Sequence, residues 1–527
     1  MYSVRIKSNL FDLSNDYYGT CDMGQLIPVD AKIVNPGDTF RAESSALVRL
    51  QPLVAPQLTP INVRIDYFFV PLRLLWKNWE KFITGGPDGN DNSVKPKIII
   101  PAGGFKPHSL ADYFGIEPGK GSGVKISALF FRAYNKIWNE WYRDENLQEE
   151  VVWSDDDGDD TVTSTDLLYR CWQKDRFTNS LPWAQRGNSV SLPLGSIAPV
   201  KGNGMTLGLT DGTNYAGASG SNSVGFSYVS ENYGKPINTQ SGTNISLANG
   251  RSFGITTDSE KSGMVVDLTE ATSAPVNDLR KAFQVQKWME RNARAGVRYI
   301  EFILAHFGVK SSDARLQRSE YLGGGKSPVV VSEVLQTSSS DSTSPQGNMA
   351  GHGFSVPTTI QFTRGFEEYG ILMSLMSIVP RSSYMNGLEK KWSLNSRYDY
   401  YFPEFCHLGE QPVKNQEVYL QDASVKDEEG NSVNEGSFGF QGIYDEYRHS
   451  YSYVTGDFRN SLKQYTLARD FAEMPKLNSD FVTCKPSKRI FAVTDENVNS
   501  FMFHIYHNVK ALRLMPKYPE PGLIDHM

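Results

Sequence analysis

The sequence predicts a mainly β protein, an antiparallel sandwich or barrel with large insertions. Strand-like segments are spread over the whole chain and do not alternate strictly with helices. The few helical patterns lie in long connections between those segments. No internal repeat is visible, and 527 residues are enough to bury a large core.

The first strong strand pattern covers residues 62–70 (NVRIDYFFV), where apolar and polar side chains alternate until Pro71. This period of two predicts a half-buried strand. Upstream, a turn sequence at 35–38 (NPGD) precedes a strand-like stretch over 39–50. After Pro71 the apolar spacing becomes helical and ends at the glycine pair 85–86.

Two further helices are predicted from apolar residues at spacings of three and four. The first covers about 126–142, and the second covers about 278–295. Asn277 is a suitable N-cap for the second helix, and Gly296 is a suitable stop.

Later strands are predicted from short apolar runs, and the run over 369–379 is apolar on both faces. The other predicted strands are 328–336, 354–362, 489–493 and 501–509. Between 187 and 272 the chain becomes rich in Gly, Ser, Asn and Thr, with short β-like pieces such as 224–229 and 264–268. We expect this segment to be a surface insertion, and 337–348 to be a loop.

The composition argues against several classes of function. Aromatic residues make up 12% of the chain and charged residues 21%, which favours buried or interfacial surface. A net charge of −6 argues against wrapping nucleic acid by bulk charge. Four scattered cysteines form no zinc or disulfide pattern, and the N-terminus shows no apolar leader, so we expect synthesis and folding in the cytoplasm.

No catalytic signature, cofactor motif or metal site is predicted. Gly325-Lys326-Ser327 resembles the end of a phosphate-binding loop, but Glu320 stands where that motif needs glycine. The acidic run 155–160 does not match calcium-loop spacing and is interpreted as a solvated acidic turn. His504 and His507 would point to opposite faces of a strand, so we expect structural or surface roles.

Basic residues interleaved with aromatics gather late in the chain. Such a pattern can hold single-stranded nucleic acid by backbone attraction and base stacking, although a solvated face over a core-facing aromatic row would give the same pattern. The DNA-facing candidates are Lys485, Lys488, Arg489, Lys510, Arg513 and Lys517.

The tail 511–527 contains three prolines, so we expect an extended arm that docks either on a neighbouring subunit or on its own domain. Most tryptophans should lie in the core, and some should lie at subunit contacts, where Trp is favoured. The interface candidates are Trp76, Trp79, Trp138, Trp141, Trp288, Met515, Tyr518, Leu523 and Ile524.

Several collinear segments together resemble one family, the major capsid protein of the Microviridae, which are small tailless phages with circular single-stranded DNA. The longest is 277–324, and the tail from Met515 to His526 is another. The remaining matching segments are 35–40, 68–79 (FFVPLRLLWKNW from 68), 176–183, 444–448 and 456–458. The insertion at 187–272 is similar to the gokushovirus branch, whose capsid proteins carry a surface protrusion there.

The resemblance implies an eight-stranded antiparallel jelly roll in one domain over 1–527, with long insertions. These would be a helical and loop insertion at 72–183, the protrusion at 187–272, a helical insertion at 277–324 and the C-terminal arm at 511–527. It also implies an icosahedral shell of sixty copies around the DNA, assembled in the host cytoplasm, with the protrusion facing a host receptor. The implied partners are a small basic DNA-binding protein, a pilot protein and a scaffolding protein.

One alternative class stays open from the residues. Abundant aromatics and Gly/Asn-rich loops also suit a β-sandwich carbohydrate-binding protein or glycosidase. Such a protein is normally exported, and no export signal is recognised here. A membrane barrel is disfavoured because regular amphipathic strands are lacking.

Overall fold

The computed structural model describes most of the chain. It covers residues 7–188, 190, 276–335, 349–355 and 360–518, and five short strands between residues 200 and 266. The chain divides into two units, one formed by Met1–Arg186 with Glu290–Met527 and the other by Gly187–Met289. Within the described residues, no helix is both long and apolar enough to cross a membrane.

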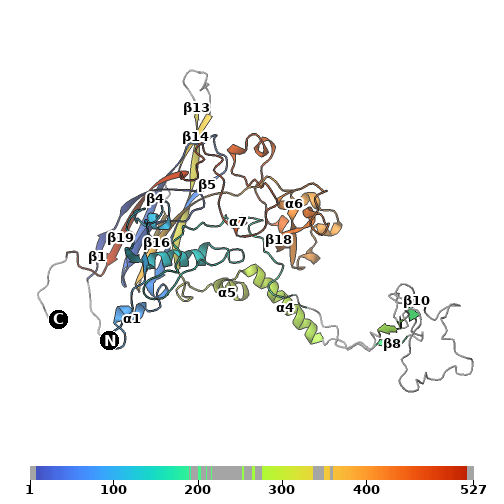
Figure 1. Ribbon diagram of the computed structural model, residues 1–527, viewed down its shortest axis with the longest axis horizontal. Helices are drawn as coiled ribbons and strands as arrows, with labels where there is room; N and C mark the ends of the chain where they lie inside the picture. The colour runs from blue at the N-terminus through green and yellow to red at the C-terminus, as the bar shows by residue number, and fades with distance from the viewer. Residues whose placement is uncertain are drawn as a thin grey trace, which may run out of the picture. The chain divides into compact units, whose positions relative to one another are not determined.

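The first unit is built on a large antiparallel sheet system of ten strands (Figure 1). The strands are β1 (Asn9–Asp12), β2 (Asn15–Cys21), β3 (Ile27–Val34), β4 (Thr39–Leu50), β5 (Ile61–Pro71), β13 (Glu320–Leu335), β14 (Met349–Ser355), β15 (Ile360–Gly365), β16 (Gly370–Pro380) and β19 (Phe501–Arg513).

Two four-strand runs of continuous pairing stand out within this system. One runs β2–β19–β4–β15, with Phe501 opposite Leu50 at one end of its β19–β4 pair. The other runs β3–β16–β5–β13, with Gly370 opposite Pro71 at one end of the β16–β5 pair. Every neighbouring pair in both runs is antiparallel. The two runs are joined through β14, which pairs with β13 along seven residues and with β4 at one.

Helices and small sheets fill the connections. The helices are α1 (Trp79–Thr84), α2 (Leu110–Tyr113), α3 (Leu129–Ile137) with a π-helical turn at Trp138–Tyr142, α4 (Val276–Ala295), α5 (Tyr299–Phe307), α6 (Asn415–Val418) and α7 (Ser479–Val482). Two-stranded sheets join β6 (Lys97–Ile99) to β7 (Lys125–Ser127) and β17 (Glu410–Lys414) to β18 (Ser437–Gly442).

The second unit is described only in its short strands and part of α4. Strand β8 (Val200–Gly202) pairs with β12 (Met264–Val266), and β9 (Leu209–Thr210) pairs with β10 (Tyr215–Ala216) and β11 (Ser252–Phe253). The predicted piece at 264–268 is therefore a strand in its first three residues. The predicted piece at 224–229 and the loop at 337–348 lie outside the described residues.

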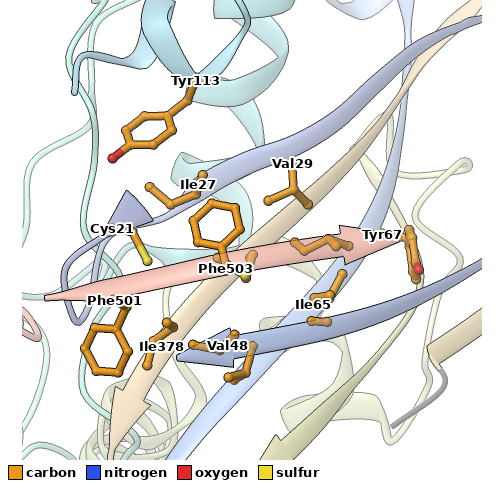
Figure 2. Close-up of a cluster of buried hydrophobic side chains, with 14 of the residues drawn as sticks. Cys21, Ile27, Val29, Val48, Ile65, Tyr67, Tyr113, Ile378, Phe501 and Phe503 are labelled. Atoms are coloured by element: carbon orange, nitrogen blue, oxygen red, sulfur yellow. The ribbon is translucent and has the colours of Figure 1, made fainter. Parts of the chain in front are cut away.

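The main hydrophobic core lies between the two four-strand runs. Phe501 and Phe503 of β19, Ile65 and Tyr67 of β5 and Ile378 of β16 all belong to this core, and Phe501 lies beside Ile378 (Figure 2). Strand β19 alternates strictly, so that every second side chain enters this core. Burial of apolar surface on this scale is the main stabilising contribution to the sandwich.

A second core lies on the outer face of β5 and β16. Phe68 and Val70 pack there against the inserted helix α3 and the turn before α1. The half-buried character predicted for 62–70 therefore holds only at the beginning of the strand, because from Ile65 onward both faces are covered. Asp66, expected to face solvent, is buried and accepts hydrogen bonds from Arg64 and the hydroxyl of Tyr142.

Most predicted elements are confirmed, with shifted ends. The strand over 39–50 and the doubly buried strand near 369–379 are correct. The predicted strand at 354–362 is two strands, β14 and β15, and that at 328–336 is the second half of β13. The predicted strand at 489–493 is wrong: this segment makes one isolated bridge, from Phe491 to Leu53.

Helix ends also differ from the predictions. The helical stripe after Pro71 forms a 3-10 turn and then the short helix α1, which ends at Gly85 with φ of 83°. Helix α4 begins at Val276, one residue before the residue predicted to cap it. Strand β19 continues to Arg513, so the first three residues of the segment 511–527 are strand and not arm.

Candidate assembly and nucleic-acid surfaces

The six DNA-facing candidates do not form one cluster. Lys485, Lys488 and Arg489 precede β19, whereas the other three lie at its far end or beyond it. The strand has 13 residues, and at about 3.3 Å per residue its ends are roughly 40 Å apart. The two groups are close in the sequence, but the extended strand β19 lies between the first group and the far end of the strand.

In the first group, two side chains serve the fold. Arg489 is half-buried and donates hydrogen bonds to the carbonyl oxygens of Thr466 and Ala468, at 2.9 Å and 2.6 Å. Burial lowers the pKa of this guanidinium from its ordinary value. Lys488 lies 3.0 Å from the carboxylate of Asp22. Lys485 is exposed, with its ammonium 4.6 Å from the centre of the Tyr169 ring.

In the second group, Lys510 and Arg513 also have partners within the fold. Lys510 pairs with Asp12 at 2.5 Å, on the outer face of the sheet. Arg513 donates to the carbonyl oxygen of Ile33 at 2.8 Å. Only Lys517, stacked 6.0 Å from the Tyr518 ring, is wholly a tail residue.

The tryptophan candidates divide by burial. Trp76 and Trp138 are buried in the second core, so neither can contact a neighbouring subunit in this conformation. Trp79 and Trp141 are half-buried against the same core, and the indole N–H of Trp141 donates to Ser319 Oγ at 2.9 Å. Trp288 is 50% exposed.

The C-terminal interface candidates lie after strand β19, in a segment that first contacts the N-terminal part of its own chain. The side-chain amide of Asn9 donates to the carbonyl oxygen of Met515 at 2.8 Å. The side chain of Met515 is exposed, and Tyr518 is 68% exposed. Leu523 and Ile524 lie outside the described residues.

Two exposed apolar surfaces were missed by the sequence reasoning. Helix α5, with the sequence YIEFILAHF, has no buried residue, and Phe307 is 71% exposed. The second surface is an aromatic segment in the connection after β16, where Trp392 is 70% exposed. Its other exposed rings are Tyr398, Tyr400, Tyr401 and Phe402. The sequence of α5 is apolar at most positions, and this run is the feature from which a contact surface could have been predicted. Monomeric proteins rarely expose apolar patches of this kind, so an exposed one indicates a binding partner.

The motifs with alternative chemical interpretations are accounted for by the fold. His507 is buried and shares a 2.7 Å hydrogen bond with Ser44, while His504 shares one of 2.7 Å with Asp16 near the surface. In the acidic run, Asp160 is buried against Arg132, and its exposed neighbour Asp159 pairs with a lysine. Among the described residues, no group of three potential ligands is placed to hold a metal ion.

Exposed apolar surfaces of this kind in the described part of the chain are typical of proteins that assemble with partners. The comparisons with known proteins make this specific. A family model described as "Capsid protein (F protein)" matches residues 1–523, and the chain belongs to this capsid protein family.

The similar relatives agree with this assignment. The chain is 38% identical to Capsid protein VP1 of Chlamydia phage 1, across 99% of this chain and 96% of the relative. It is 34% identical to Capsid protein VP1 of Bdellovibrio phage phiMH2K, over 99% and 96%. It is 32% identical to Capsid protein VP1 of Spiroplasma virus 4, over 95% and 93%.

The resemblance to the major capsid proteins of gokushovirus-like Microviridae is thus confirmed. The chain is a major capsid protein of small single-stranded-DNA phages, a structural protein and not an enzyme. A capsid protein assembles with copies of itself into a shell and is a component of the virion. The carbohydrate-binding alternative is not favoured.

Proposed function

We propose that sixty copies of this chain assemble in the host cytoplasm into an icosahedral shell around a circular single-stranded DNA. The subunit body would be an eight-stranded jelly roll. The observation that carries this proposal is the strand pairing: β2–β19–β4–β15 and β3–β16–β5–β13 use eight strands in two antiparallel runs of four, with one core between them. A double sheet of this kind makes a stiff wedge with few open edges.

The connections would supply the contacts between subunits. The segments 72–183 and 277–319 would be insertions between jelly-roll strands, and both contain helices. The predicted end of the second insertion at 324 is wrong, because residues 320–324 already belong to β13 and pair with β5. Helix α5 is the favoured contact because Tyr299, Leu304 and Phe307 are exposed on it in the single chain. Trp288, Met515, Tyr518, Leu523 and Ile524 remain interface candidates, and the tail would clasp a neighbour. Many modest contacts repeated by symmetry give a stable shell.

The segment 187–272 would project outward and carry host attachment, with three copies meeting at a symmetry axis. The division of the chain at Gly187 supports treating this segment as a separate unit. Deleting it should abolish adsorption to host cells while leaving particles intact, as seen by electron microscopy. Loss of particles would contradict the assignment of this segment to attachment.

The DNA requires positive charge that the chain does not supply overall. With a net charge of −6, the shell needs a small basic DNA-binding protein to neutralise packaged phosphate. A scaffolding protein and a pilot protein complete the proposed set of partners. Of the DNA-facing candidates, Lys485 and Lys517 are the ones best placed to reach a ligand, since Lys488, Lys510 and Arg513 are paired with carboxylates and Arg489 binds backbone carbonyls.

The test of the shell is electron microscopy of the full chain co-expressed with the neighbouring phage genes. Uniform small spherical particles are the expected result. Dispersed monomers in the presence of the scaffolding protein would overturn the proposal.

A further inference from the structure

Helix α5 presents an apolar stripe that the described part of its own chain leaves open in part. Five apolar side chains recur at helical spacings that place them on one face of the helix, and they are Tyr299, Ile300, Ile303, Leu304 and Phe307. None of the five is buried, and the exposed fraction is 68% at Tyr299 and 71% at Phe307. An exposed apolar patch of this kind indicates a surface that a partner covers.

The remaining positions of α5 hold the helix on its own subunit through polar contacts. Glu301 lies 3.2 Å from the guanidinium of Arg298, which directly precedes the helix, and Arg298 also pairs with Glu145 at 2.6 Å. Near the other end of the helix, His306 shares a hydrogen bond of 2.7 Å with Asn292 of α4. These contacts fix the position of α5, so the stripe is already formed before a partner binds.

The surroundings of the stripe are basic, although the whole chain carries a net charge of −6. Residues 290–318 contain six Lys and Arg side chains and three Asp and Glu side chains. Arg291 and Lys310 are exposed, and neither has an ion-pair partner among the described residues. Arg291 directly precedes Asn292, and Lys310 lies just beyond the C-cap of α5, so both cations lie near the last turn of this helix. The stripe therefore suits an apolar ligand that carries negative charge.

The last residues of the chain have the matching composition. In the segment 519–527 (PEPGLIDHM) two apolar residues, Leu523 and Ile524, are adjacent. They are flanked by the carboxylates of Glu520 and Asp525, and the segment contains no Lys or Arg. Fully extended, these nine residues reach roughly 30 Å beyond the described part of the tail, whereas the nine residues of α5 cover about 14 Å. Two prolines restrict φ in this segment, so ordering it on a surface costs less conformational entropy.

We propose that the segment 519–527 of a neighbouring copy docks on the apolar stripe of α5. Leu523 and Ile524 pack against the stripe, and the two carboxylates of the segment face Arg291 and Lys310. Burial of exposed apolar surface supplies most of the attraction, and the charges orient the segment. This inference rests on the proposed function for assigning the segment to another copy of the chain, and it names the surface that the C-terminal tail clasps.

The first test measures, by fluorescence anisotropy, how a fluorescein-labelled peptide with the sequence of residues 515–527 binds to the full-length subunit. The subunit carries Leu523→Ser/Ile524→Ser, so that its own tail does not compete with the peptide. Adding Arg291→Glu/Lys310→Glu to the subunit should weaken binding about tenfold, because attraction by two exposed cations becomes repulsion.

Two comparisons make this result specific to the site. A peptide with Glu520→Lys/Asp525→Lys should regain affinity for the subunit with reversed charges on α4 and α5. The matched control, Arg41→Glu/Lys106→Glu, reverses one exposed arginine and one exposed lysine elsewhere in the chain and should bind the original peptide normally. Undetectable binding of the peptide, or equal binding by the two charge-reversed subunits, would overturn the proposal.

A second test shows which copy supplies the tail. Assembled particles of Phe307→Cys/Leu523→Cys are treated with a short bismaleimide cross-linker, with wild type and the single variants as controls for the four native cysteines. Cross-links between chains are the expected result, seen as dimers and larger species on denaturing gels. A link within one chain would overturn the assignment to a neighbouring copy, as would intact particles without a link between positions 307 and 523. Missing wild-type particles would instead contradict the proposed shell, whereas the peptide measurement does not depend on assembly.

Discussion

Arg132 is a residue of helix α3, and its guanidinium is fully buried, where it joins this helix to Leu75 and to the acidic segment 156–160. It lies 2.7 Å from the carboxylate of Asp160 and donates to the carbonyl oxygens of Leu75 and Asp156, at 3.0 Å and 2.9 Å. Methionine at this position would fill much of the same space with an unbranched, apolar side chain, but it lacks the N–H donors of the guanidinium. The Asp160 side chain, itself unexposed, then remains charged in the protein interior without its counter-ion.

The size of the effect follows from this burial. Removing one partner of a buried ion pair costs about 3–5 kcal/mol, because the remaining charge cannot be solvated. The matched control is Lys125→Met, which breaks the pair with Asp159 in the same acidic run. There both side chains are nearly half exposed, and such pairs contribute only about 0–1 kcal/mol.

The assay is urea unfolding of the free subunit, followed by tryptophan fluorescence. Arg132→Met should lose several times more unfolding free energy than Lys125→Met, and adding Asp160→Asn should recover part of that loss by removing the stranded charge. The reasoning is refuted if the Arg132 and Lys125 variants are equally stable, or if Asp160→Asn brings no recovery.

The same pair predicts a dependence on pH. Burial by itself raises the pKa of Asp160, but hydrogen bonds from Thr163 and Arg132 outweigh it, and the pKa lies below its ordinary value. A carboxyl with a lowered pKa contributes stability above the unfolded pKa, near 3.9, and loses it as the pH falls through the folded pKa. The difference between wild type and Arg132→Met should therefore narrow below about pH 4.

Three further predictions concern other regions. Burial lowers the pKa of His507, so the fold holds it neutral; stability should fall as the pH drops below about 6.5, and His507→Gln should flatten that decline in urea titrations. Gly24→Ala should reduce the melting temperature and the yield of soluble subunit, because φ is +81° there and the new Cβ would overlap the carbonyl oxygen of Cys484; a normal yield would contradict this. Leu304→Ser with Phe307→Ser should leave subunit stability unchanged, because both side chains are exposed on α5, but should reduce the particle peak in sedimentation; unchanged assembly would exclude α5 as a contact.

The sequence predicted strands and helices correctly where the local pattern of apolar residues matches the surface that the element buries. The run 369–379 is apolar at most positions, as is typical of a strand covered on both faces, and β16 is buried along its whole length. The stripe over 126–142 likewise has one apolar face, and α3 buries it. The segments that resemble the capsid family lie along almost the whole chain, as the family match over 1–523 does.

Local patterns failed where a distant segment supplies the partner. The segment 489–493 is a short apolar run like those of the other predicted strands, yet it makes only one isolated bridge in the described part of the chain, to Leu53. Strand β1 was not predicted, because its four residues carry little pattern and are ordered by pairing with the far end of β19.

The sequence by itself determined the β-rich class, most strands, the helical insertions and the family, because these depend on periodicity and on residues close together in the chain. Only the tertiary structure decided that Asp66 is buried, that Trp76 and Trp138 are core residues, and that the six late cations lie at two ends of β19. It also placed α4 beside the end of α5, where Asn292 and His306 share a hydrogen bond. Burial and the direction of a charged side chain depend on segments far apart in sequence, and no local pattern contains that information.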